Sequence, residues 1–322
     1  MTGILIGAIS MGMVFLLGCV GEIVTEKAGH LNLGLPGIMC MGTAGGCFGV
    51  SMYMESLSYV GNAQYLPLIL LPILFAMLFA MFGGLIYAFL TVSLRVNQNV
   101  VGLALTTFGA GFAQFFIDNF VVTGRFSRAS KIIRTPLSFA ENLGWFGEVF
   151  LSHGLLVYIA IAIAIVTAII LRKTKVGLSL RAVGESPATA DAVGINVTRY
   201  KYLAILTGSA IAGLGGLLYV MEYNSGTFDN TLTIQSFGWL AIALVIFTMW
   251  KPDFSILGSI LFGALYILGF KIKGISSLGQ LELIKLLPYV ITVIVLIITS
   301  ITGSKEMQPP ASLGLNYFRE ER

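Results

Sequence analysis

Ionisable and amide side chains gather in one short interruption between two apolar blocks. The interruption, GEIVTEKAGHLNLGLPGIMCMG, covers residues 21–42 and is rich in glycine and proline, which oppose a continuous helix. Non-helical backbone is tolerated in lipid only where protein buries it or water reaches it. The segment therefore either lines a cavity at membrane depth or forms an ordinary interfacial loop. Glu22 favours the cavity, because an ionisable residue at the end of an apolar span is a candidate functional residue. The ionisable and amide side chains here are Glu22, Glu26, Lys27, His30 and Asn32.

A second polar group opens the apolar block at 94–115, LRVNQNVVGLALTTFGAGFAQF. Uncharged amides and hydroxyls suit a neutral, hydrogen-bonding solute better than an ion. Alternatively, Asn97 or Asn99 caps a helix and the threonines mediate helix packing; the two roles are compatible. The amides Asn97, Gln98 and Asn99 open the predicted helix, and its polar stripe includes Thr106, Thr107 and Gln114.

A third motif, VGESPATADAVGINVTRYKY, lies in a basic loop between two apolar blocks. Ser186 followed by Pro187 is a helix-start signal, residues 188–193 favour a helix, and Gly194 ends it. We expect a short amphipathic helix flanked by basic residues. Such a helix either binds a soluble cytoplasmic partner or rests on lipid headgroups.

Motifs for catalysis and for cofactor binding are absent from the sequence. It contains no Walker A motif, nucleophile elbow or dinucleotide fingerprint. His30 and His153 are too few for a metal site, and the three cysteines lie in apolar stretches without CxxC spacing. We therefore expect no enzyme activity, metal or cofactor in this chain. A chain of this kind that moves a solute must obtain its energy from a partner.

The composition places these motifs on membrane-spanning helices. Of the 322 residues, 57% are hydrophobic and 11% are charged, and the mean hydropathy is +0.91. Soluble domains are about 45–50% apolar and about 25% charged. The net charge of +4 is too small to indicate nucleic-acid binding. The N-terminal segment lacks a basic region and a cleavage pattern, so we interpret it as a retained first helix.

The apolar blocks predict an all-α, polytopic helical membrane protein. A spanning helix needs about 20 apolar residues, and six blocks reach that length: 3–23, 66–94, 99–120, 150–171, 202–223 and 283–302. Three shorter blocks are 37–53, 237–250 and 254–270. We expect about eight to ten transmembrane helices, with a broken or re-entrant segment near residues 24–40. Residues 1–303 should form the transmembrane domain, with a cytoplasmic loop at 172–201, and residues 304–322 a cytoplasmic tail.

Positive charge in the loops predicts the orientation, because short cytoplasmic loops carry an excess of lysine and arginine. The loop 172–201 is the most basic and is assigned to the cytoplasm. Alternation then places the loop 121–149 outside, although it is basic too. Either the helix count is wrong by one or these charges have an extracellular role. The charges in question are Arg125, Arg128, Lys131 and Arg134.

Three motifs in order, at 21–42, 94–109 and 181–216, resemble the inner-membrane permeases of bacterial ABC importers for nucleosides. That group also includes the simple-sugar and branched-chain amino-acid permeases. The resemblance covers most of residues 1–300. It implies a multi-pass protein of the bacterial cytoplasmic (inner) membrane that forms the translocation pathway for a small polar solute, most simply a nucleoside.

The resemblance also implies partners and site residues. The partners would be a second permease subunit, commonly a paralogue, two ABC ATPase subunits that carry ATP and Mg, and an extracytoplasmic substrate-binding (lipo)protein. The basic outer loop would meet that binding protein. Residues on the solute pathway would include Glu22, Asn32, Asn97 and Gln98, joined by the stripe Thr106, Thr107 and Gln114. Residues that dock on the ATPase would be Glu185, Ser186, Pro187, Thr189, Asp191, Ala192, Gly194 and Ile195.

Other functions remain open at this point. Related permeases serve riboflavin or simple sugars, and no single side chain decides among these solutes. A stand-alone channel or secondary carrier would work without ATPase subunits. A membrane-embedded enzyme would need clustered catalytic residues near one leaflet, and the sequence has none.

Overall fold

The computed structural model describes residues 2–136, 143–271, 283–284, 286–302 and 308–318. In those residues the chain is helical and contains no strand. The long helices are α1 (Thr2–Glu26), α2 (Leu35–Ser56), α3 (Tyr65–Ala88), α4 (Gln98–Phe120), α7 (Leu155–Lys173), α10 (Val197–Leu218), α11 (Thr231–Phe247), α12 (Pro252–Lys271) and α14 (Leu287–Thr302). Helix α3 continues as a π-helical turn, η2 (Phe89–Ser93), and α10 as η4 (Tyr219–Tyr223). The short helices are η1 (Val60–Asn62), α5 (Phe126–Ile133), α6 (Gly144–Phe150), α8 (Lys175–Glu185) and α9 (Pro187–Ala192).

The long helices confirm the predicted polytopic architecture. Among the described residues, six helices are long and apolar enough to cross a membrane, and α11, α12 and α14 are apolar but shorter. The apolar block predicted at 37–53 is shorter than the helix that the structure shows there. It forms the 22-residue helix α2, because Pro36 starts the helix early and residues 54–56 extend it. Within the segment predicted as broken or re-entrant, residues 27–34 are non-helical and join α1 to α2, whereas residues 24–26 and 35–40 are helical.

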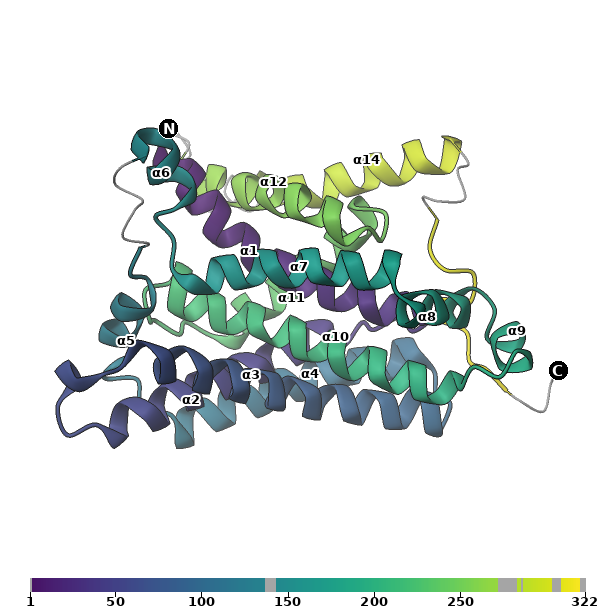
Figure 1. Ribbon diagram of the computed structural model, residues 1–322, viewed down its shortest axis with the longest axis horizontal. Coiled ribbons are helices and arrows are strands. Elements are labelled where there is room, and N and C mark those ends of the chain that lie inside the picture. The colour runs from purple at the N-terminus through teal and green to yellow at the C-terminus, as the bar shows by residue number, and fades with distance from the viewer. Residues whose placement is uncertain (1, 137–142, 272–282, 285, 303–307, 319–322) are drawn as a thin grey trace.

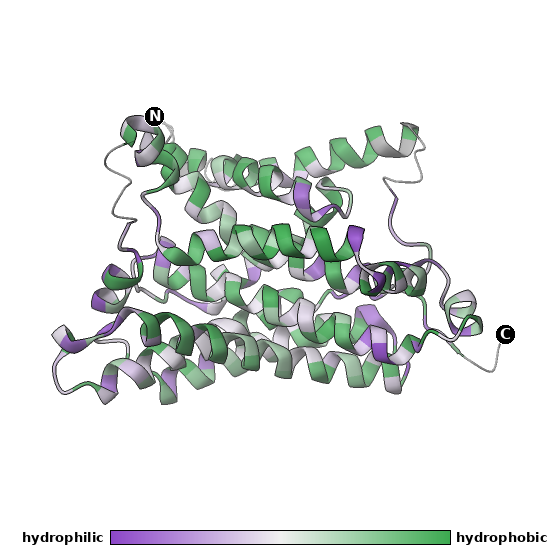
Figure 2. Ribbon diagram, in the orientation of Figure 1, coloured by the Kyte–Doolittle hydropathy of each residue, from purple (hydrophilic) through white to green (hydrophobic). Residues whose placement is uncertain are grey.

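Helices α1 and α2 form the centre of the bundle. Helix α1 packs against α12, α10 and α11, and α2 packs against α3, α10 and α4. Hydrophobic residues fill the middle of the long helices, whereas hydrophilic residues gather toward the two ends (Figure 2). Helix α3 instead exposes a row of leucines spaced four residues apart, which is one face of a helix: Leu66, Leu70, Leu74 and Leu78. That face suits lipid or another apolar protein surface.

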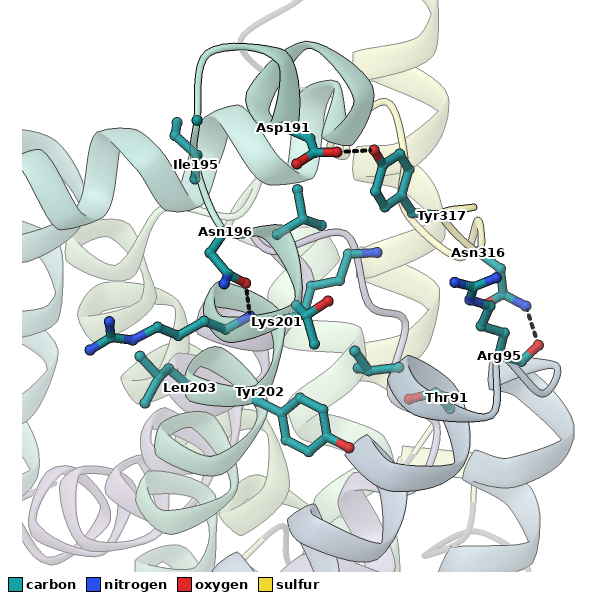
Figure 3. A pocket seen from close by; sticks show the side chains of 15 residues that line it. Thr91, Arg95, Asp191, Ile195, Asn196, Lys201, Tyr202, Leu203, Asn316 and Tyr317 are labelled. Atoms are coloured by element: carbon teal, nitrogen blue, oxygen red, sulfur yellow. Dashed lines mark hydrogen bonds between the residues drawn. The ribbon is translucent and has the colours of Figure 1, made fainter. Parts of the chain in front are cut away.

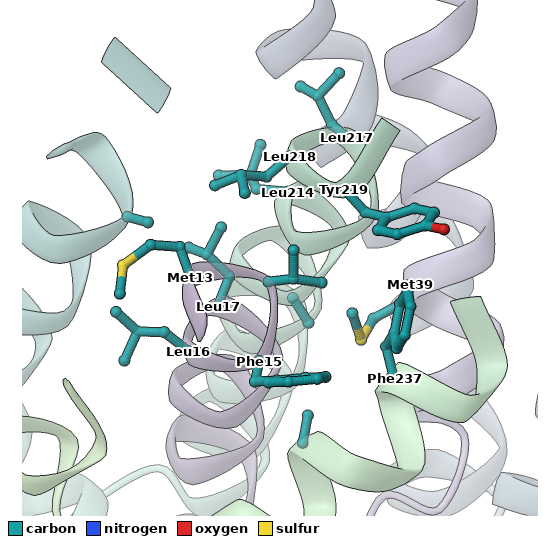
Figure 4. Close-up of a cluster of buried hydrophobic side chains, with 14 of the residues drawn as sticks. Met13, Phe15, Leu16, Leu17, Met39, Leu214, Leu217, Leu218, Tyr219 and Phe237 are labelled. Carbon is teal, nitrogen blue, oxygen red and sulfur yellow. The ribbon is translucent and has the colours of Figure 1, made fainter. Parts of the chain in front are cut away.

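Aromatic contacts join α1, η4, α11 and α12 in the core, and Figure 4 shows three of the rings, those of Phe15, Tyr219 and Phe237. Phe237 of α11 lies with its ring centroid 5.8 Å from that of Phe15 in α1 and 4.7 Å from that of Tyr219 in η4. Tyr266 of α12 completes the group at 5.6 Å from Phe237. The pairs are edge-to-face, the arrangement that the ring quadrupole favours.

The two ends of the bundle carry different short elements (Figure 1). Helices α8 and α9 and the described tail residues lie at one end, here called the α9 end. The N-terminus, α5 and α6 lie at the opposite end, here called the α5 end. The described part of the loop 121–149 is therefore opposite to α9, as the helix count predicted; its residues 137–142 lie outside the described part of the chain. The count is not wrong by one.

Close backbone contact between α2 and α10 depends on glycine. A Cβ atom added to Gly42 would lie 2.3 Å from the Cα atom of Gly213, which is closer than atoms can approach. Small residues at such crossings let two helices pack backbone to backbone. The fit of α10 between α2 and α3 thus requires the absence of a side chain at these positions.

We predict that Gly42→Ala lowers the thermal stability of the purified protein. Overpacking a core typically costs about 1–3 kcal/mol, and the opposing atoms here belong to backbone that cannot rotate away. The measurement is the unfolding midpoint in detergent. Gly111→Ala is the matched control, because a Cβ atom there meets nothing within 4 Å. Equal midpoints for the two variants would contradict this account of the packing.

Candidate functional site

The linker at residues 27–34 is buried at the α9 end, and side chains of the spanning helices satisfy its backbone. The backbone N–H of Asn32 donates to Glu22 Oε1 at 3.1 Å, and Asn32 Oδ1 accepts the N–H of Gly34 at 3.0 Å. The indole N–H of Trp250 donates to Glu26 at the end of α1. Buried backbone groups need such partners, and the side chains of Glu22 and Asn32 supply them here.

Helices α3 and α4 hold the same linker from the other side. Gln98 Oε1 accepts the N–H of Leu31 at 2.8 Å, and the Tyr87 hydroxyl donates to the carbonyl of Leu31 at 2.7 Å. The hydroxyl of Thr106 donates to the carbonyl of Leu33 at 2.8 Å. The structure thus brings together four of the predicted pathway residues around the linker: Glu22, Asn32, Gln98 and Thr106.

The other three predicted pathway residues lie apart from the linker. Asn97 is the N-cap of α4, and its Oδ1 accepts the N–H of Asn99 at 3.0 Å, which confirms the alternative capping role. Thr107 is exposed and donates to Leu103 in its own helix. Gln114 donates to Asp118 at 3.0 Å, also on α4. Their place on the solute pathway stays a prediction.

Helix α9 matches the predicted docking helix. Ser186 is its N-cap, with Oγ accepting the N–H of Thr189 at 3.4 Å, and Pro187 is its first residue. Gly194 follows in the left-handed region at φ +86°, which glycine adopts without strain. Ala190 packs inward with Val183 of α8 and Val197 of α10. The helix stands out beyond the rest of the bundle (Figure 1) and leaves exposed small side chains at Ala188, Thr189, Ala192 and Val193.

The C-terminal segment 308–318 is bound across the α9 end, whereas the sequence predicted only a linker-like tail. The N–H of Ser312 donates to the carbonyl of Gly184 at 3.0 Å, and the N–H of Gly314 donates to the carbonyl of Gly29 at 3.2 Å. Its hydrogen bonds join single residues to partners far away in the sequence, so no apolar periodicity could have revealed the docking. Residues 304–307 and 319–322 of the predicted tail lie outside the described residues.

The same segment also contacts α9 and the turn after η2. The hydroxyl of Tyr317 donates to Asp191 Oδ2 at 2.8 Å, and Asn316 Nδ2 donates to the carbonyl of Arg95 at 2.6 Å. One carboxylate oxygen of Asp191 is therefore directed to the tail. The segment links α9 to the linker through Gly29, a connection that sequence reasoning missed.

At the α5 end, some of the basic side chains of the loop 121–149 form contacts within the protein. Arg125 forms an ion pair with Glu55 at 3.4 Å and donates to the carbonyl of Leu57 at 2.8 Å. Arg134 donates to Ser225 Oγ at 2.6 Å. Arg128 and Lys131 are exposed on α5. Arg125 thus helps to hold the ends of neighbouring helices together, and the more exposed charges stay available to a partner.

His30 is a buried imidazole at the centre of the linker. It is 1% exposed, and neither ring nitrogen has a hydrogen-bond partner among the described residues. Its ring meets that of Tyr87 edge-on, with 6.4 Å between centroids. Burial, with a further contribution from the Lys201 cation, lowers the pKa of His30 well below its ordinary value. The neutral form is therefore the one that fits this site.

We predict that His30→Leu makes the free energy of unfolding less dependent on pH in the acidic range. Because the pKa of His30 is lower in the folded state than in the unfolded state, the unfolded chain binds more protons as the pH falls below about 6.5. The wild type should then lose up to about 1.4 kcal/mol per pH unit through this residue, and the variant should not.

The measurement is the unfolding midpoint in detergent between pH 8 and pH 5. Above pH 7 both proteins should show the same dependence on pH, which serves as the internal control. A wild-type profile that is just as flat as the variant's would show that His30 does not act in this way.

Comparison with known proteins gives a consistent result over nearly the whole chain. Residues 4–296 match the family described as the permease component of branched-chain amino acid transport systems. The nucleoside ABC transporter permease protein NupC of Lactococcus lactis subsp. cremoris is 31% identical over 94% of this chain and 92% of its own length. A putative glucose ABC transporter permease protein of Haloferax volcanii is 30% identical over 99% of this chain and 98% of its own length. The guanosine ABC transporter permease protein NupQ of Bacillus subtilis is 27% identical over 95% of this chain and 93% of its own length.

Proposed function

The chain belongs to the family of permease components of branched-chain amino acid transport systems, and on this premise we propose that it forms the solute pathway of an ABC importer. Its energy would come from ATP and Mg bound to separate ATPase subunits. The observation that carries the proposal is α9, a capped helix that stands out from the bundle and exposes small side chains. A stand-alone channel or secondary carrier does not need a docking surface for an ATPase.

The solute we propose is a nucleoside. Two of the relatives are named for nucleoside or guanosine transport, at 31% and 27% identity. The uncharged amides and hydroxyls of α4 suit a neutral solute rich in hydrogen-bonding groups. A simple sugar is the second candidate, because a relative with 30% identity is named for glucose. Riboflavin is a third candidate, because it is also a neutral solute rich in hydrogen-bonding groups.

Helix α9 is the proposed docking element for an ATPase subunit. The exposed side chains Ala188, Ala192 and Val193 are small or medium in size, so α9 can fit closely into a groove of the partner. Asp191 instead contacts Tyr317, which supports an internal role for this carboxylate in fixing α9. A push on α9 would pass through the tail to Gly29 of the buried linker. The geometry thus supports a mechanical link between the docking surface and the polar residues of α1 and α4.

The remaining partners follow from the orientation. We place the α9 end in the cytoplasm of a bacterium, because basic residues are concentrated in cytoplasmic loops. A second permease subunit, commonly a paralogue, would pack beside this chain in the inner membrane. A substrate-binding (lipo)protein would dock at the α5 end. There a cavity of about 500 Å³ is lined by Lys131 and Arg134, which would attract carboxylates and orient the encounter.

Substitution of α9 by a large charged residue tests the proposed docking. We predict that Ala192→Arg, in the complete transporter, reduces ATP-dependent uptake of radiolabelled guanosine at least tenfold, because the side chain prevents close approach of the ATPase. Membrane insertion should be unchanged, since Ala192 is exposed. Val176→Arg is the matched control, because Val176 is 59% exposed on the neighbouring helix α8.

Two results would count against the proposal in different ways. Normal uptake in Ala192→Arg would mean that α9 does not dock on the ATPase. Inhibition of guanosine uptake by excess glucose, but not by excess uridine, would mean that the solute class is wrong while the coupling still holds.

A further inference from the structure

A polar cavity of about 710 Å³ opens at the α9 end, beside the proposed docking helix (Figure 3). Its walls come from η2 and the turn after it, from the connection between α9 and α10, from the first turns of α10 and from the tail. The positively charged side chains that line it are Arg95, Arg199 and Lys201. The proposed transport mechanism assigns no role to this cavity.

Lys201 is the most unusual residue in the lining. It is only 3% exposed, yet in the part of the chain that the structure describes its ammonium group has no hydrogen bond or ion pair. Its charge acts on His30, which lies deeper in the linker. Most of this side chain is thus packed among protein atoms while its ammonium group reaches the cavity, where an anion would offset the water lost on burial. The site therefore calls for a negative charge that the described residues do not supply.

The charges around Lys201 do not meet this need. Asp191 is the acidic residue in the lining; its Oδ2 accepts the hydroxyl of Tyr317 at 2.8 Å, and its carboxylate forms no ion pair with Lys201. Arg199 is exposed at the rim of the cavity and adds positive charge. Arg95 adds another positive charge, and its guanidinium carbon lies 4.8 Å from the ring centroid of Phe318. The cavity as a whole therefore favours an anion.

The start of α10 adds backbone donors to the same cavity. Val197 and Thr198, the first two residues of this 22-residue helix, line it. Helix N-termini carry unpaired N–H groups and a partial positive charge, which suit phosphate oxygens. The side chain of the cap residue Asn196 accepts the N–H of Arg199, at 2.9 Å. A buried cation and a helix N-terminus thus converge on one space.

We propose that this cavity binds a phosphate group. A phosphate has several oxygens and can contact an ammonium, a guanidinium and helix N–H groups at once, whereas a carboxylate offers only two. The group can belong to free phosphate in the cytoplasm or to the headgroup of an anionic phospholipid. Leu203, 49% exposed at the edge of the cavity, provides an apolar border of the kind that an acyl chain would follow.

Occupation of the cavity would affect the position of α9. The cavity separates the connection after α9 from the turn after η2, and the tail crosses both through Asp191 and Arg95. A phosphate held by Lys201 and the start of α10 would fix this geometry. The ligand would therefore act on the docking helix from inside the permease.

The test measures binding of two probes to the full-length purified chain. In the first arm, inorganic phosphate is titrated against the protein in a non-ionic, lipid-free detergent at constant ionic strength, with chloride as the reference anion. In the second arm, native mass spectrometry counts phosphatidylglycerol retained by the chain, with phosphatidylcholine as the reference lipid. Saturable binding in either arm is expected, and the arm that responds identifies the source of the phosphate.

Variants decide whether the binding occurs in this cavity. Lys201→Met keeps the length of the side chain but removes its charge, and should weaken binding at least tenfold. Arg199→Gln should also weaken it and does not disturb a buried residue, so it remains informative if Lys201→Met fails to fold. Lys173→Met, exposed at the same end, is the control and should bind normally. No binding in either arm, or equal loss in all three variants, would overturn the proposal.

Discussion

Every backbone N–H and C=O group inside a membrane must find its partner within the protein, because lipid offers none. Long helices satisfy this requirement by themselves, but the connection between α1 and α2 cannot. At residues 27–34 the partners are side chains from three different helices, including Glu22, Tyr87 and Gln98. The polar residues in an otherwise apolar bundle are thus explained first by the need to bury a non-helical segment. The part in solute passage that we propose for them would build on that arrangement.

The same requirement connects the buried linker to the surface. The tail adds its own backbone groups to the α9 end, bonding to Gly29 of the linker and to Gly184 of α8, and its Tyr317 reaches Asp191 of α9. The docking helix is therefore not an isolated projection. Its movement would be felt at the linker, and from there at the carboxylate of Glu22 and the amide of Gln98. This chain of hydrogen bonds would provide the physical basis for energy coupling in the proposed transporter.

The sequence predicts what local chemistry determines. Long apolar blocks revealed the helices, proline and glycine revealed the break after Glu26, and Ser186 with Pro187 revealed the start of α9. It could not predict which side of α4 is buried, because Thr106 and Thr107 are adjacent and chemically alike, yet only Thr106 faces the linker. The docked tail could not be predicted either, because its hydrogen bonds join residues far apart in the sequence and its few apolar residues form no periodic pattern.

The central claim is that this chain provides a pathway but not the energy, and solute flux in proteoliposomes tests it most directly. The chain would be reconstituted alone and then together with its second permease subunit, ATPase subunits and binding protein. The account predicts that guanosine accumulates only in the complete assembly and only with ATP and Mg. Guanosine flux through vesicles that contain this chain alone would contradict it.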